Sequence, residues 1–465
     1  MGKKSGKELE KLLYKNETVA DSMPDQMAAA HEFCEGYKQF LNAAKTEREV
    51  VAYSEELLRG AGYKPFVPGQ KLNPGDKVYV INRKKCVLAA TIGQKSLAEG
   101  FHMNIAHVDA PRLDLRPVPL FEKTGLAYLR THYYGGVRKY QWATIPLSIH
   151  GVMYRADGSC AEICIGENPS DPVFCITDLL PHLAAKQNEK KLPEGITGEN
   201  LNILFGSDPI EDKDVENRVK LNVLGMLNET YGVTEKDFTR AEIEIVPAFT
   251  ARDVGLDRSM IGAYGHDDRV DAYPALMAEL TTVSPAYTTV CVLTDKEEVG
   301  SDGVTGLNSM YTFHFLQQLC ETQGVDYITA CKASKCLSAD VTAAYDPTYD
   351  DAFELDNGTY AGRGVAIYKY TGSRGKSSTS DASAELVNYL TSLMNRNNVV
   401  WQIGEMGKID LGGGGTVAKY VANQDIDTID IGVPVLSMHS PFEVVSKADV
   451  YMAYLTFKAF CEDEQ

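Results

Sequence analysis

Apolar residues near the start of the chain recur at the spacing of an α-helix. Four of them would share one face of that helix: Val50, Val51, Leu57 and Leu58. The helix is expected to open in the polar run 46–49 and to stop at Gly60 and Gly62, because glycine readily ends helices. The pattern predicts an amphipathic helix that packs on a core formed by later segments.

Short apolar runs bounded by turn residues come next, as expected for buried strands. The runs 78–81 and 86–92 flank the polar tetrapeptide 82–85, which predicts a hairpin. The run 103–108 predicts a further buried strand. A sheet therefore begins early in the chain.

Helices and strands alternate again in the second half of the chain. Helices are predicted at 271–283, 380–395 and 446–461, and strands at 288–293 and 429–436. Such alternation is typical of helices packed on both faces of a sheet. We predict an α/β fold, a three-layer sandwich with a mixed, largely parallel sheet.

The pattern between about residues 112 and 246 differs from the rest. Short β-like pieces are separated by turn signals at 135–136 and 157–158, and the stretch 187–200 is rich in lysine and glutamate. The chain has 465 residues, which exceeds the roughly 250 to 300 residues of a single core. We therefore predict one domain in two parts, 1–112 and 248–465, with a β-rich domain inserted at 113–247.

The amino-acid composition and net charge of the chain limit the kinds of molecule that it is expected to bind. Lys plus Arg number 46 and Asp plus Glu number 64, which gives a formal net charge of −18. This charge repels polyanions, so nucleic acid is not an expected partner. An apolar fraction of 44% with 24% charged residues is typical of a globular protein with a substantial core.

Cysteine usage and hydropathy favour the cytoplasm. Ten cysteines without a CxxC pair are too sparse for a disulfide scaffold or a zinc knuckle. Residues 1–13 are charged and lack the apolar stretch of a signal peptide. No run of about 18 apolar residues predicts a membrane span. We expect a cytoplasmic protein that does not contact membranes.

Histidine and acidic side chains gather where the predicted strands end, which is the edge at which α/β sheets build their sites. His107 and Asp109 are two positions apart on an extended chain, so Asp109 can orient a metal-bound imidazole. Taken alone, the pair is more readily explained as a solvated strand end. Glu297 and Glu298 follow the apolar run 290–293. One of them can bind a cation while the other takes a proton from water, with a charged loop as the alternative.

Three further groups have the same character. Asp340 and His439 each follow an apolar run, and either alone is more often a structural residue. In the run 265–269, Asp267 or Asp268 either caps the next helix or bridges two metal ions through its two oxygens. Two histidines and several carboxylates at successive strand ends are together the ligand types of a two-metal hydrolase.

The order of these motifs resembles the M18 metallopeptidases, the aspartyl aminopeptidase family. The motifs are H-V-D-A-P at 107–111, H-D-D-R at 266–269, K-E-E-V-G-S-D at 296–302, S-A-D at 338–340 and S-M-H-S at 437–440. The resemblance extends over nearly the whole chain, and Pro181-His182-Leu183 resembles a further family element. It implies a metallo-aminopeptidase, a hydrolase that removes N-terminal residues from peptides.

The resemblance implies a dinuclear site that usually holds zinc. The implied ligands are His107 and Asp340 for one ion, Glu298 and His439 for the other, and Asp267 as the bridge. The register of the family's bridging aspartate favours Asp267, and Asp268 stays the alternative. Cobalt or manganese are alternative metals, because histidine and carboxylate ligands accept them as well.

Side chains that do not bind metal also take roles from the resemblance. Glu297 is expected to be the general base, and Asp109 to steer the imidazole of His107. The inserted domain would be a dimerisation domain that brings His182 into the neighbouring subunit's site. The expected assembly is a homo-oligomer built from dimers, a tetrahedral dodecamer.

The implied substrate is a peptide whose first residue is Asp or Glu. Lys369, Arg374 and Lys376 lie in the region that would receive the acidic side chain, with a solvated charged face as the alternative. Gly415, in the glycine run 412–415, would let the backbone approach the substrate closely, with a flexible strand connection as the alternative. Alternatives in the same reaction class are a neutral or broad-specificity aminopeptidase, or a dinuclear carboxypeptidase or deacylase. A non-catalytic assembling scaffold is an alternative of a different class, and the complete set of ligand types argues against it.

Overall fold

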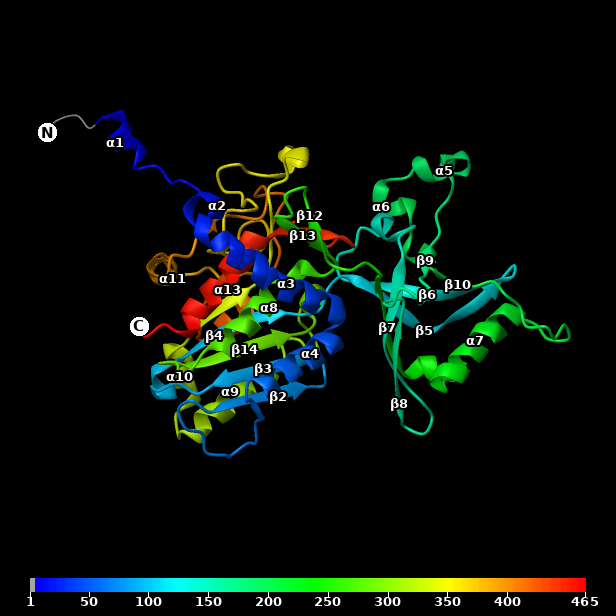
Figure 1. The fold of residues 1–465 in the computed structure, drawn as a ribbon, viewed down its shortest axis with the longest axis horizontal. Coiled ribbons are helices and arrows are strands. Elements are labelled where there is room, and N and C mark those ends of the chain that lie inside the picture. The colour runs from blue at the N-terminus through cyan, green and yellow to red at the C-terminus, as the bar shows by residue number, and fades with distance from the viewer. Residues whose placement is uncertain (1–4) are drawn as a thin grey trace.

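Two bodies of different composition lie side by side in the computed structural model, which describes residues 5–465 (Figure 1). Residues 1–4, which open the predicted first domain and the predicted charged N-terminal segment, lie outside the described residues. The larger body is built of helices and strands, and the smaller body is mostly sheet. Within residues 5–465, no helix combines the length and the apolar content that crossing a bilayer requires.

A nine-stranded mixed sheet is the centre of the larger body. Its strands in spatial order are β1 (Lys64–Pro65), β2 (Lys77–Asn82), β3 (Cys86–Thr91), β14 (Thr288–Thr294), β4 (Phe101–His107), β15 (Lys335–Ala339), β19 (Asp427–Gly432), β17 (Val365–Tyr368) and β18 (Trp401–Ile403). The central strands β14, β4, β15 and β19 are parallel, whereas β3 and β17 run antiparallel to their central neighbours. The predicted mixed, largely parallel sheet is confirmed.

Helices cover both faces of this sheet. One face packs against α3 (Met27–Ala43), α4 (Glu47–Gly60), α8 (His266–Thr281), α11 (Ala384–Arg396) and α13 (Lys447–Cys461). The other face packs against α9 (Tyr311–Thr322), α10 (Tyr327–Ala333) and α12 (Ala418–Ala422). Neighbouring residues of β14 alternate between the two cores, with Leu293 in the first and Val292 in the second. The larger body is the predicted three-layer sandwich.

The helix predicted after residue 46 forms as α4. Thr46 is its N-cap and shares a capping box with Glu49, because each side chain accepts a hydrogen bond from the other residue's backbone N–H. Two short helices, α1 (Gly6–Glu10) and α2 (Val19–Ser22), precede α3 along the chain.

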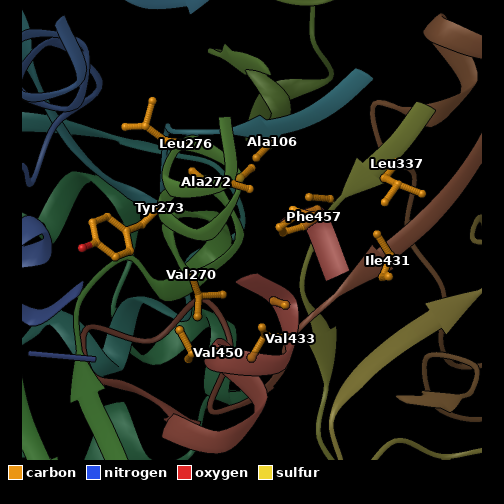
Figure 2. Packing of buried hydrophobic residues seen from close by; sticks show 14 of the residues in the cluster. Ala106, Val270, Ala272, Tyr273, Leu276, Leu337, Ile431, Val433, Val450 and Phe457 are labelled. Carbon is orange, nitrogen blue, oxygen red and sulfur yellow. The ribbon is translucent and has the colours of Figure 1, made fainter. Parts of the chain in front are cut away.

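Figure 2 shows part of the core that holds α8 and α13 against the sheet. Val270 and Leu276 of α8 belong to the same buried cluster as Phe457 of α13 and Ile431 of β19. Nearly every residue of α8 from its first turn onward is buried. The apolar packing therefore fixes the start of α8, where Asp267 lies.

A small five-stranded sheet, which the sequence pattern did not predict, lies beside the start of α8. Its order is β12 (Arg252–Val254), β13 (Met260–Ala263), β21 (Glu443–Ser446), β20 (Pro434–Leu436) and β16 (Thr342–Ala343). The strand expected at 429–436 is split between β19 and β20. Gly432 lies against the backbone of Asp340, where a Cβ would meet the carbonyl oxygen at 1.8 Å. Pro434 has no N–H to continue the ladder, so the chain changes sheets here.

The smaller body is a seven-stranded antiparallel sheet with one long helix, α7 (Arg218–Tyr231). Its strands in order are β8 (Cys160–Ile165), β7 (Leu147–Tyr154), β11 (Ala241–Pro247), β5 (Arg112–Lys123), β6 (Leu126–Tyr134), β10 (Ile203–Gly206) and β9 (Cys175–Ile176). A separate hydrophobic core surrounds Trp142. The short helices α5 (Ala185–Asn188) and α6 (Leu192–Gly195) project from its outer end (Figure 1). The limits 113 and 247 of an inserted domain stay a prediction.

Candidate metal centre

The ends of three parallel strands bring the candidate ligands together. Strand β4 ends at His107, and Asp340 directly follows β15. Strand β14 leads into a short 3-10 helix, Glu297–Val299, which carries two glutamates. Because these strands are neighbours and parallel, their carboxyl ends meet at one edge of the sheet.

Asp267 lies between the two histidines. Its Oδ1 is 3.2 Å from Nε2 of His107, and its Oδ2 is 3.0 Å from Nε2 of His439. One carboxylate that faces two imidazoles through its two oxygens is the arrangement of a bridging ligand. The neighbouring Asp268 instead accepts a hydrogen bond from the backbone N–H of His107 at 3.2 Å. The geometry favours Asp267 over Asp268 as the bridge.

The two glutamates take different positions around this carboxylate. Oε1 of Glu298 is 3.6 Å from Nε2 of His439, and Oε2 of Glu297 is 4.0 Å from Nε2 of His107. Ligand atoms of His107, Asp267 and Glu298 all lie within 4.8 Å of one another, as do those of His107, Glu297 and Asp340. The structure thus brings together every predicted metal ligand.

Asp109 holds the glutamate segment as well as the histidine. Its two carboxylate oxygens accept hydrogen bonds from the backbone N–H groups of Glu297 and Glu298, at 3.1 and 3.2 Å. Nδ1 of His107 is 3.0 Å from the backbone carbonyl oxygen of Asp109 and 3.3 Å from its Oδ1. Tyr134, at the end of β6 in the smaller body, donates a hydrogen bond to Asp109 at 2.6 Å. The sequence pattern did not single out Tyr134.

Glu443 on β21 is a second residue that the sequence pattern missed. It is buried, and its two oxygens accept hydrogen bonds from the backbone N–H groups of Asp267 and His439, at 3.1 and 2.6 Å. One side chain therefore positions both the bridging residue Asp267 and its neighbour His439. The sequence contained one indication of this role, an acidic residue directly before two valines in a buried strand. A buried carboxylate needs hydrogen-bond donors around it, so such a residue is expected to hold neighbouring groups in place.

Burial dominates the electrostatics of the site. It raises the pKa of Glu297 to about 7, and the Asp267 and Asp109 carboxylates add to that shift. Burial also raises the pKa of the Glu298 and Asp340 carboxyls well above their usual values. Repulsion between neighbouring carboxylates adds to the effect of burial, and a divalent cation there would offset that repulsion.

The residues present fit zinc. Among the described residues, Nε2 of His107 and Oε1 of Glu298 are buried without a hydrogen-bond partner and face the common space. Imidazole nitrogens and carboxylate oxygens are ordinary zinc ligands. The second nitrogen of each imidazole is held by a carbonyl oxygen, that of Asp109 for His107 and that of Gly136 for His439. Such support is usual for metal-binding histidines.

A cavity of about 270 Å³ opens beside Asp340. Of the predicted substrate-binding residues, Arg374 and Gly415 line this cavity and Lys369 does not, and their role stays a prediction. The backbone carbonyl of Lys369 accepts a hydrogen bond from the N–H of Ala382. Lys376, the third cation considered for an acidic substrate side chain, also lines the cavity. Three further charged side chains line it and had not been singled out: Lys408, Glu405 and Asp430.

His182 lies apart from the other candidate residues. It is exposed on the short 3-10 helix Pro181–Leu183, directly before α5 at the outer end of the smaller body (Figure 1). It therefore does not join the metal centre of its own chain, and a role at a neighbouring subunit's site stays a prediction.

Known proteins resemble this chain over nearly its whole length. The family described as "Aminopeptidase I zinc metalloprotease (M18)" matches residues 40–461. A probable M18 family aminopeptidase 1 of Borrelia garinii is 47% identical over 440 residues, which cover 93% of this chain and 96% of the relative. The crystal structure of an M18-family aminopeptidase from Thermotoga maritima superposes with a TM-score of 0.92 at 42% identity, covering 97% of this chain and all of the other. The yeast mApe1 dodecamer shares the fold, with a TM-score of 0.75 at 20% identity over 94% of this chain and 97% of that one.

We expect Glu443→Gln to weaken zinc binding about tenfold to 100-fold without unfolding the chain. The amide that replaces one carboxylate oxygen would place an N–H against the N–H of Asp267 or His439, so one of the two ligands loses its support. Competition with a chromophoric chelator measures the affinity. Glu385→Gln, on the exposed surface of α11, is the matched control. Unchanged zinc affinity in Glu443→Gln would contradict the positioning role.

Proposed function

We propose that this chain, which belongs to the M18 family of zinc metallo-aminopeptidases, releases single N-terminal residues from peptides at a site of two zinc ions. The observation that carries the proposal is the Asp267 carboxylate between the imidazoles of His107 and His439. His107 and Asp340 would hold one ion, and Glu298 and His439 the other. When bound, the zinc ions supply Lewis acidity that polarises a peptide carbonyl and makes a water more acidic.

Glu297 is the general base in this proposal. It takes a proton from the attacking water and gives it to the leaving amine. Burial raises the pKa of Glu297 above the ordinary value of a carboxyl, which makes its carboxylate a stronger base. The hydrogen bond from its backbone N–H to Asp109 holds the segment in place, so the carboxylate faces the space between the histidines.

The cavity beside Asp340 would receive the side chain of the first residue. Arg374, Lys376 and Lys408 in its wall support a preference for Asp or Glu, because a cationic wall compensates a buried carboxylate. Glu405 and Asp430 line the same cavity and favour the second candidate, an aminopeptidase of neutral or broad specificity.

A homo-oligomer built from dimers completes the proposal. The exposed position of His182 supports a role at the site of a partner subunit, where it would hold the substrate carbonyl. A protein of the same fold has been solved as a dodecamer, and we propose a tetrahedral dodecamer in the cytoplasm for this chain.

Hydrolysis of aminoacyl chromophores tests the function. The purified protein should cleave free-amine substrates, lose activity with a chelator, and regain it when zinc, cobalt or manganese is restored. N-acetylated versions of the same substrates are the matched control and should be resistant. Faster cleavage of Asp and Glu substrates than of Leu and Ala substrates would select the acidic preference. Equal cleavage of blocked and free substrates would exclude an aminopeptidase.

Glu297→Gln should lower kcat about 100-fold to 10,000-fold, because the amide cannot accept the proton. Zinc content and assembly size should stay as in the wild type, since Gln is nearly isosteric with Glu. Metal analysis and gel filtration check both. Full activity in this variant would show that another group is the base.

His182→Ala should lower kcat on the order of 100-fold, the usual effect of losing one donor to a developing oxyanion. Zinc content should not change. Subunit exchange with Glu297→Gln distinguishes action in trans from action within one chain. Mixed dimers would pair an intact base from one subunit with an intact His182 from the other, and so recover activity. Mixtures that stay inactive after exchange would contradict the shared site.

A further inference from the structure

A second cluster of metal-ligand side chains lies where the two bodies meet. Glu49 comes from α4 of the larger body, and His150 and Cys164 come from strands β7 and β8 of the smaller body. One ligand atom from each lies within 4.8 Å of the other two. Nδ1 of His150 is 2.7 Å from Oε1 of Glu49 and 3.9 Å from Sγ of Cys164.

We propose that Glu49, His150 and Cys164 bind a divalent ion of the zinc class at this junction, separate from the aminopeptidase centre. Thiolate, imidazole and carboxylate together are ligands that zinc accepts, and the thiolate disfavours magnesium and calcium. Three protein ligands leave a fourth position open. Cys164 is exposed, so that position and the entry path lie on the solvent side.

Hydrogen bonds already orient two of the three ligands. Nε2 of His150 is 3.0 Å from Oε1 of Glu167, which leaves Nδ1 for the ion. A carboxylate on the distal nitrogen is the usual support of a metal-binding histidine. Oε2 of Glu49 accepts the backbone N–H groups of Lys45 and Thr46 at 2.9 and 3.0 Å, so Oε1 is the oxygen that faces His150. The N-cap of α4 therefore holds Glu49, and β7, which lies between β8 and β11, holds His150.

Charge balance favours exchange of a divalent ion for two protons. Each ring nitrogen of His150 lies within hydrogen-bond distance of a carboxylate, an arrangement that favours the protonated ring when no metal is bound. With Lys45, which pairs with Glu167 at 2.8 Å, the metal-free cluster contains two cations and two carboxylates. On binding, His150 and Cys164 each release a proton to solvent. The net charge of the cluster then stays the same, so the ion adds no uncompensated buried charge.

Small side-chain movements complete the geometry. Tetrahedral zinc has bonds of about 2.0 Å to nitrogen and oxygen and about 2.3 Å to sulfur, which place nitrogen and sulfur about 3.5 Å apart and nitrogen and oxygen about 3.3 Å apart. Sγ of Cys164 is 3.9 Å from Nδ1 of His150 and has to move slightly closer to it. Oε1 of Glu49 is 2.7 Å from the same nitrogen and has to move slightly away. The ion would tie α4 to the edge of the smaller body's sheet.

Cobalt titration of the full-length, metal-stripped protein tests this site apart from the catalytic one. A thiolate-to-cobalt charge-transfer band in the near ultraviolet reports only a site with a cysteine ligand. The proposed catalytic ligands are imidazoles and carboxylates, so cobalt bound there gives no such band. We expect the intensity of the band at saturation to correspond to one cobalt ion bound at this site per chain. Added zinc should then displace the cobalt and remove the band.

Cys164→Ser should abolish the band, and Cys160→Ser should leave it unchanged. Cys160 is the matched control because it is also exposed and lies on the same strand, four positions earlier. Circular dichroism checks that both variants are folded. Absence of the band in the wild type, or its persistence in Cys164→Ser, would overturn the proposal. Either result is independent of whether the chain cleaves peptides.

Discussion

The concentration of negative charge at one edge of the main sheet is the constraint on which the rest of the structure depends. Asp267 lies between two imidazoles, and further buried carboxylates surround it. An isolated buried charge costs several kcal/mol, so the fold surrounds these groups with donors. Asp109 and Glu443 each accept two backbone N–H groups from residues of the centre. Carboxyl groups whose pKa is raised by burial ionise more readily beside a divalent cation, which is the electrostatic reason why such cations suit this edge.

The smaller body takes part in this centre through the end of β6. Tyr134 donates a hydrogen bond to Asp109, and the carbonyl oxygen of Gly136 lies 3.2 Å from Nδ1 of His439. Each body therefore fixes one imidazole, since His107 is held by Asp109 of the larger body. A shift of the smaller body relative to the main sheet would change the direction in which the ring of His439 points.

The positions of candidate ligands could be predicted from the sequence where a histidine or acidic residue directly follows an apolar strand. His107 and Asp340 sit at the ends of apolar strands, so periodicity alone placed them at one sheet edge. Tyr134 and Glu443 act through contacts between segments that are distant in the chain. The only local signal for Glu443 is its position before two valines, and this does not show which backbone groups it holds. Lys369 is not among the residues that line the cavity beside Asp340, because the position of a charged residue in the sequence does not determine which space its side chain enters. The five-stranded sheet was missed because its strands are two to four residues long, too short for periodicity to resolve.

Ion pairs at the start of α4 connect the larger body to the smaller body close to the candidate metal centre. Glu47 is fully buried and pairs with Lys85 at 2.9 Å and with Arg112 at 3.4 Å. Arg112 opens β5, three positions after Asp109, so the ion pairs that attach the smaller body also fix the segment that carries Asp109. Buried pairs of this kind determine position more than they add stability, because desolvation offsets their attraction. The same junction therefore fixes both the orientation of the smaller body and the positions of the side chains in the candidate metal centre.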